Sequence, residues 1–116
     1  MKIKESLKVE SENISMYGSA GTSIQWLWSK EDDVPHFALR RFTIRPGGKI
    51  GLHNHGEEHE IFILSGTGKV FNNSGEEYQV KANDTLFVPQ DEPHGYYNSG
   101  TEDLIFLCII PLLQKD

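Results

Sequence analysis

The sequence predicts an all-β fold, an antiparallel sandwich or a closed barrel, and two observations lead to this prediction. Short apolar or alternating runs recur along the chain, and each is followed by a turn signal rich in Gly, Pro, Asn or Asp. No long window has a convincing 3.6-residue period, so no long amphipathic helix is expected.

The predicted strands follow one another at short intervals. At 23–29 apolar and other side chains alternate with the two-residue period of a strand. A longer run at 36–45 is expected to stop at the Pro-Gly-Gly sequence that follows it. The complete series of predicted strands is 23–29, 36–45, 50–55, 61–64, 69–71, 77–80, 85–88, 94–97 and 103–110. Upstream, we expect an edge strand around Leu7 and Val9 and a loop at 19–21.

The composition is that of one ordinary globular domain. The 116 residues are 37% hydrophobic and 24% charged, so the chain is expected to form a single domain with one core. The net charge of -6 and the lack of a basic run argue against nucleic-acid binding and against an anionic membrane surface. The single cysteine, Cys108, excludes an intrachain disulfide. Neither an apolar signal region nor a membrane-spanning run is found, so a cytoplasmic location is expected.

Four of the five histidines lie in two short segments, and this is the strongest functional signal in the chain. His53, His55 and His59 fall within HNHGEEHE, and His94 lies in DEPHGYYN. Residues i and i+2 of a strand share a face, so His53 and His55 are expected to point the same way. Neutral imidazole is the commonest metal ligand in proteins. We therefore predict a metal site built from two separated segments; solvated turn histidines are the alternative.

The spacing of these histidines resembles the first sequence motif of the cupin superfamily, in particular of its small single-domain members. That motif reads G-x5-H-x-H-x3,4-E-x6-G, and the chain matches it at Gly47, His53, His55 and Gly66. His59 stands where the typical family member has a glutamate. Glu60 follows one position later and would point to the opposite face of a regular strand.

The second cupin motif, G-x5-P-x-G-x2-H-x3-N, is matched in its spacing by Pro89, His94 and Asn98. Asn83 and Asp91 stand in place of its two glycines. The resemblance implies a cupin double-stranded β-helix, or jelly-roll barrel, formed by residues 1–116 as one domain. Its metal-binding core would extend over about residues 42–111.

The resemblance also implies one divalent transition metal held by His53, His55, His59 and His94. Manganese is the first expectation, because some small cupins that resemble this chain combine it with four histidines; Fe, Ni, Cu and Zn also accept nitrogen ligands. A neutral ligand set leaves the ion's charge uncompensated, which favours the binding of small anions. Four protein ligands leave two open positions of an octahedron for substrate, water or dioxygen.

Several apolar residues are candidates for the wall of the pocket. Strand alternation places Phe106, Cys108 and Ile110 on one face, which either lines the metal pocket or packs the core. Tyr96 is two residues beyond His94 and shares its face. It is either a pocket wall or a packing residue.

The charged candidates are fewer. Arg40 and Arg41 point to opposite faces of a strand, so one of them is expected to enter the barrel and bind a carboxylate; two rim charges are the alternative. Arg40 is included among the pocket candidates, although alternation alone does not say which arginine faces inward. Glu57 and Glu58 are expected to be solvated.

Three functions fit such a site. The first is a metal-dependent, dioxygenase-like oxidoreductase acting on a small organic molecule at the two open positions. The second is a non-redox isomerase, decarboxylase or lyase that uses the ion as a Lewis acid on an enolisable carbonyl. The third is a non-catalytic module that binds a small ligand. No residue is assigned a catalytic role.

The expected partners follow from the same features. They are a small molecule, such as a carboxylate or an enolisable compound, and a second copy of the chain, but neither nucleic acid nor membrane. Family members commonly form homodimers, and residues 1–21 are expected at that interface.

Overall fold

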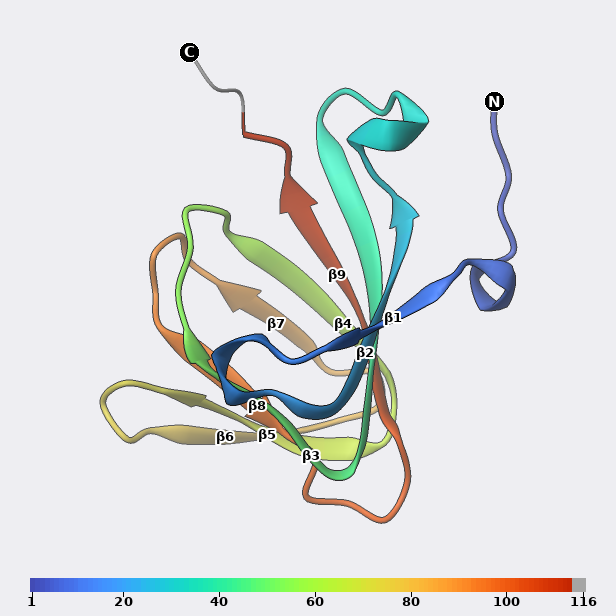
Figure 1. The fold of residues 1–116 in the computed structure, drawn as a ribbon. Coiled ribbons are helices and arrows are strands. Elements are labelled where there is room, and N and C mark those ends of the chain that lie inside the picture. The colour runs from blue at the N-terminus through green and yellow to red at the C-terminus, as the bar shows by residue number, and fades with distance from the viewer. Residues whose placement is uncertain (114–116) are drawn as a thin grey trace.

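The computed structural model describes residues 1–113 and confirms the all-β prediction: nine strands form one antiparallel sheet that curls into a barrel (Figure 1). The strands are β1 (Ser11–Ile14), β2 (Ala20–Trp28), β3 (Phe37–His53), β4 (His59–Ser65), β5 (Thr67–Asn72), β6 (Glu77–Lys81), β7 (Thr85–Val88), β8 (His94–Tyr97) and β9 (Leu104–Pro111). Three single-turn 3-10 helices accompany them, namely η1 (Ser6–Lys8), η2 (Met16–Gly18) and η3 (Lys30–Asp32). Within the described residues there is no α-helix.

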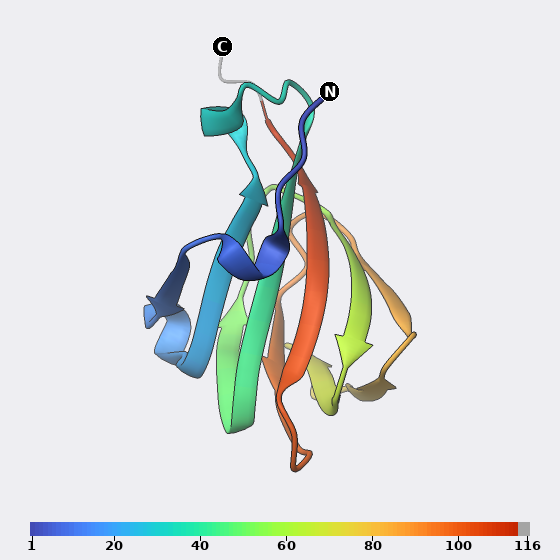
Figure 2. The same ribbon diagram turned by 90° about the vertical axis from the view of Figure 1, so that its right-hand side faces the viewer.

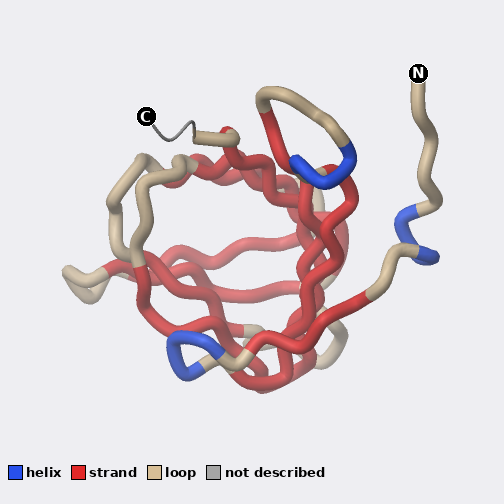
Figure 3. The backbone as a smooth tube through the Cα atoms, turned by 45° about the horizontal axis from the view of Figure 1, so that its top comes forward, coloured by secondary structure: helices blue, strands red, loops and turns tan. Residues whose placement is uncertain are grey.

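The strands are ordered so that the long strand β3 lies at the centre of the sheet, between β8 and β9. The hydrogen-bonded order is β6-β5-β8-β3-β9-β4-β7, and β2 pairs with β3 while β1 pairs with β2. Figure 2 shows β2, β3 and β9 side by side, and the view in Figure 3 shows the strands surrounding a common interior. β3 pairs with β2, β8 and β9, so it connects the strands on one side of the barrel with those on the other.

The longest strand, β3, runs through the Pro-Gly-Gly sequence at 46–48, so the prediction that a strand stops there is wrong. Gly47 adopts a φ of 79°, in the left-handed region that glycine tolerates, and this bends the strand. Hydrogen bonds continue through the bend, since Gly47 N–H donates to Asn98 O and Asn98 N–H donates to Gly48 O, both at 3.0 Å. The bend lets residues 37–44 pair with β9 and residues 49–53 pair with β8.

The N-terminal strand lies at Ser11–Ile14, not around Leu7 and Val9, and two of the residues in the predicted loop 19–21 belong to β2. The segment before β1 coils into η1 because it is held from the sheet: Gln25 Nε2 donates to Val9 O at 3.0 Å. β1 pairs with β2 of the same chain. The following turn, η2, then carries the chain back toward the end of β3 (Figure 1).

Inward-facing residues of the strands form the apolar core. β9 shows the alternation clearly, with Leu104, Phe106, Cys108 and Ile110 buried and the residues between them less so. The Phe106 ring lies 5.1 Å from the Phe42 ring, centroid to centroid. Burial of such a ring stabilises the fold by about 2–3 kcal/mol. Across residues 1–113, no helix has the length and apolar character needed to cross a bilayer.

Candidate metal centre

Four histidines come together where three strands begin or end. His53 is the last residue of β3, His59 the first of β4 and His94 the first of β8, while His55 lies in the bend between β3 and β4. The β3–β8 register places His53 opposite His94. Their ring centroids are 4.5 Å apart, as are those of His55 and His59, and those of His59 and His94 are 5.0 Å apart. The fold therefore gathers all four histidines in one place.

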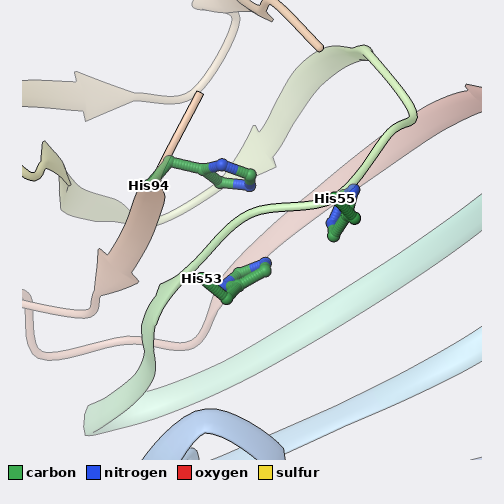
Figure 4. A group of neighbouring side chains, drawn as sticks. All are labelled: His53, His55 and His94. Atoms are coloured by element: carbon green, nitrogen blue, oxygen red, sulfur yellow. The ribbon is translucent and has the colours of Figure 1, made fainter. Parts of the chain in front are cut away.

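Three of these histidines, without His59, form a group whose possible ligand atoms all lie close to one another. One ring nitrogen each of His53, His55 and His94 lies within 4.8 Å of the other two, and Figure 4 shows the three rings turned toward a common space. His53 and His55 were predicted to lie in one strand, but β3 ends at His53 and His55 belongs to the loop that follows. Their convergence comes from the bend rather than from strand alternation.

Hydrogen bonds fix which nitrogen of His53 and His94 is free. His53 Nδ1 lies 2.8 Å from Gly51 O, and His94 Nδ1 lies 2.8 Å from Glu92 O. A carbonyl oxygen only accepts, so each Nδ1 carries the proton and leaves the Nε2 lone pair available. His94 Nε2 is buried and lacks a hydrogen-bond partner within residues 1–113. An orphaned buried nitrogen beside other imidazoles fits a metal ion, which would satisfy it.

His59 sits deeper and has more neighbours. Its side chain is buried, with 2% of the residue's surface exposed, whereas Glu60 is exposed on the other face of β4. His59 Nε2 lies 3.1 Å from His55 Nε2. His59 Nδ1 lies 3.1 Å from Cys108 Sγ and 3.2 Å from an Nη2 of Arg40. The inward histidine, not the neighbouring glutamate, thus faces the cluster.

Burial favours the neutral form of three of the imidazoles. Desolvation, reinforced by the charge of Arg40, lowers the pKa of His59 to about 2. Desolvation also lowers the pKa of His94 to about 4, although its hydrogen bond to Glu92 O opposes the shift. The pKa of His53 is lowered as well, again chiefly by desolvation. Neutral imidazoles offer the lone pairs that a divalent transition metal requires, so the donor set fits such an ion.

The two arginines are placed on opposite sides of the sheet. Arg40 faces the cavity, where its Nη2 donates to Cys108 Sγ at 3.0 Å. Arg41 instead donates from Nη1 to Gln25 Oε1 at 3.1 Å. The guanidinium carbon of Arg40 lies 4.9 Å from the centre of the Phe42 ring, within cation–π range. A fixed positive charge therefore stands beside the histidine cluster.

A cavity of about 420 Å³ contains the cluster and every residue that the sequence proposed for its wall. Those residues are Arg40, His53, His55, His59, His94, Tyr96, Phe106, Cys108 and Ile110. Tyr96 is buried, and desolvation raises the pKa of its hydroxyl well above the usual range. Burial likewise raises the pKa of the Cys108 thiol, against the opposing effect of Arg40.

Sequence reasoning missed part of the cavity wall. Trp26 and Phe42 line it, and their two-residue spacing from Ile24 and Arg40 was a signal that could have found them. Glu57 also lines the cavity and is partly exposed rather than fully solvated; its carboxylate lies 3.5 Å from His55 Nδ1. Glu58 is exposed, as expected.

Comparisons with known proteins agree with this geometry. The family model of the cupin domain matches residues 40–110. An oxalate-binding protein of Thermotoga maritima is 38% identical over 117 residues, which cover 96% of this chain and 94% of that protein. The solved structure of a predicted oxalate decarboxylase from Thermotoga maritima is 35% identical, with a TM-score of 0.85 over 97% of this chain and 100% of that one.

A further solved structure, the polyketide cyclase RemF from Streptomyces resistomycificus, is 27% identical, with a TM-score of 0.88 over 100% of this chain and 89% of that one. These likenesses confirm the predicted cupin barrel. The chain belongs to the cupin family.

Proposed function

We propose that the four histidines hold one divalent transition metal and that the cavity binds a small organic acid, with its carboxylate between the ion and Arg40. The observation that carries the proposal is that a guanidinium and the neutral histidine cluster line the same cavity, with Arg40 Nη2 only 3.2 Å from His59 Nδ1. When bound, the ion would supply positive charge and Lewis acidity. The arginine adds directional donors for the acid.

Arg40 has donor capacity to spare for such a ligand. Its Nη2 donates to Cys108 Sγ and lies beside His59 Nδ1, and its unpartnered Nε is covered by protein atoms, so Nη1, which makes no hydrogen bond within residues 1–113, is the donor left for a ligand. Nη1 can donate a charge-assisted hydrogen bond to a carboxylate oxygen. The cation–π contact with Phe42 holds the group in place without consuming donors.

The size and lining of the cavity bear on the class of acid. A volume of about 420 Å³ falls within the range of sites for drug-sized ligands, and is larger than a two-carbon acid needs. Trp26, Phe42, Tyr96 and Phe106 give it aromatic walls. The similar protein of Thermotoga maritima is named for oxalate binding. We therefore propose oxalate as the minimal ligand and a ring-bearing acid as the better fit.

The deciding experiment uses the full chain purified without added metal. Metal content is measured first; the chelator-stripped and metal-reloaded proteins are then titrated calorimetrically with oxalate, benzoate and the neutral analogue benzamide. We expect about one ion per chain, acid binding by the reloaded protein only, and weaker binding of benzamide. Equal binding of benzoate by both forms would contradict the proposal, as would the absence of affinity for any first-row divalent ion.

Catalysis in the same cavity is the second candidate. The room beyond the cluster and the similarity to RemF, a polyketide cyclase, favour a reaction on a ring-bearing or enolisable substrate. Two kinds of reaction can be distinguished by experiment. One is a dioxygenase-like oxidation, the first expectation from the sequence, and the other is a non-redox isomerisation or decarboxylation. Oxygen consumption by manganese- or iron-loaded protein but not by zinc-loaded protein would support the first; product formation with all three ions would support the second.

Three finer expectations remain predictions. They are manganese as the resident metal, a homodimer with residues 1–21 at its interface, and a cytoplasmic location. Metal analysis of the protein as isolated tests the first, and sedimentation of the full chain beside a variant lacking residues 1–10 tests the second.

A further inference from the structure

An N-terminal strap, defined as residues 12–17, forms one wall of the cavity. Glu12, Asn13, Ile14, Ser15, Met16 and Tyr17 all line it. The strap begins in β1 and ends in η2, and β1 is secured by antiparallel pairing with β2. Its far end therefore reaches the histidine cluster, although the sequence between Ser11 and Gly18 has no motif that marks it as part of a site.

Tyr17, at the end of the strap, lies flat on one of the candidate ligands. The ring centroids of Tyr17 and His53 are 4.5 Å apart and the two planes are inclined by only 10°. The His53 ring also lies 4.5 Å, centroid to centroid, from the His94 ring, at an interplanar angle of 52°. The tyrosine ring thus limits the tilt of the imidazole, while the Nδ1 bond to Gly51 O fixes its rotation.

The backbone of Tyr17 is held in an uncommon conformation to make this contact. Its φ of 59° and ψ of 31° are left-handed, which is rare for a residue with a large side chain. Tyr17 O packs so closely on Gly51 that no side chain would fit at Gly51. Gly51 therefore contacts both residues: it leaves room for Tyr17 O, and its own carbonyl accepts the hydrogen bond from His53 Nδ1. Strained residues of this kind persist where the surrounding structure fixes them, often at functional sites.

We infer that Tyr17 is a positioning residue, which holds the His53 imidazole at the angle that metal binding requires. The inference rests on the proposed metal site. The effect is exerted by the ring and not by the hydroxyl, since the contact is face to face. An aromatic pair of this geometry corresponds to roughly a two- to tenfold effect on an equilibrium.

Three substitutions separate the ring from the backbone. Tyr17→Phe keeps the ring; Tyr17→Ala removes it and keeps the strained backbone; Tyr17→Gly removes it and relieves the strain. Tyr78→Ala is the matched control, because Tyr78 on β6 is as exposed as Tyr17, at 51%, and does not line the cavity. Affinity for Co²⁺ and Zn²⁺ is measured by chelator competition, and the geometry of bound Cu²⁺ by electron paramagnetic resonance.

We expect wild-type affinity for Tyr17→Phe and Tyr78→Ala, and a two- to tenfold loss with an altered Cu²⁺ spectrum for both Tyr17→Ala and Tyr17→Gly. Tyr17→Gly should unfold at a higher temperature than Tyr17→Ala yet bind metal no better, which a merely structural role would not produce. Unchanged affinity and spectrum in Tyr17→Ala, with wild type binding metal, would overturn this inference alone. A wild-type protein without metal affinity would overturn the proposed function and this inference with it.

Discussion

Replacement of Arg40 by glutamine should change acid binding and metal binding in opposite directions. The guanidinium is the fixed positive charge of the cavity, and hydrogen bonds to charged groups contribute about 1.5–3 kcal/mol each. Loss of one such bond to a carboxylate corresponds to a decrease in affinity of roughly 10- to 150-fold. The same charge depresses the pKa values of His53, His59 and His94 by repulsion, and it must likewise repel a dication. Metal affinity should therefore rise severalfold in Arg40→Gln.

Calorimetric titration with Zn²⁺, followed by titration of the zinc-loaded protein with benzoate and oxalate, measures both effects. Arg41→Gln is the matched control, because Arg41 is the adjacent arginine on the opposite face and contacts Gln25. Its affinities should stay at the wild-type values. Should Arg40→Gln bind acid as tightly as wild type, or lose metal and acid affinity together, the assignment of Arg40 as an anion-binding group is wrong and its role is structural.

Three further predictions concern metal binding and stability. His94→Ala should lose most bound metal but only about 1–2 kcal/mol of unfolding free energy, since the apolar strands form the core; full metal occupancy would exclude His94 as a ligand. The metal-free protein should lose stability as the pH falls from about 6.5 to 4, because the unfolded chain protonates His94 near pH 6.5 whereas the folded pKa is about 4. Urea unfolding across this range should show a loss on the order of 1–3 kcal/mol, and a flat profile would contradict the pKa shift. Asn98→Ala should lower the free energy of unfolding by about 2–4 kcal/mol, because Asn98 is buried and its Nδ2 donates to Ile44 O at 2.7 Å and to Glu102 O at 2.8 Å. The metal affinity of the molecules that fold should not change.

The alternating strand pattern and the spacing of the histidines were sufficient to predict the barrel and the histidine cluster. Strand alternation at 103–110 correctly placed Phe106 and Cys108 on the inward face, and the strands at 85–88 and 94–97 were predicted to the residue. The orientation of Arg40 could have been found by the same argument. Arg40 shares a face with Phe42, an aromatic residue suited to an interior, whereas Arg41 shares one with Thr43.

The features that escaped prediction depend on backbone conformation and on pairing between distant segments. Pro-Gly-Gly usually ends a strand, but here Gly47 bends it while Asn98 supplies hydrogen bonds from across the sheet. Tyr17 has no sequence signal at all, since its approach to His53 needs a left-handed turn that nothing in residues 12–18 demands. Local patterns record which residues are apolar; they do not record such long-range contacts.

The neighbours of His59 are compatible with two tautomers of its ring, and in only one of them is Nε2 free to bind a metal. If His59 Nδ1 accepts from Arg40 Nη2, the proton is on Nε2 and that atom can only donate, for example to His55 Nε2 at 3.1 Å. If His59 Nδ1 instead donates to Cys108 Sγ, the Nε2 lone pair is free for an ion. The sulfur would then be the acceptor that orients a metal ligand.

Removal of that sulfur should therefore weaken metal binding through His59. Cys108→Ala leaves Arg40 as the neighbour of His59 Nδ1, which favours the tautomer that cannot bind, and affinity should fall about tenfold. The metal affinity of Cys108→Ser should fall less, because the serine hydroxyl keeps a hydrogen-bond acceptor at this position. The double variant Cys108→Ala/Arg40→Met should recover much of the loss, because methionine has no N–H donor to compete for His59 Nδ1. The two substitutions should therefore be strongly non-additive in a double-mutant cycle. Unchanged metal affinity in Cys108→Ala would mean that His59 is not a ligand, and that His53, His55 and His94 hold the ion alone.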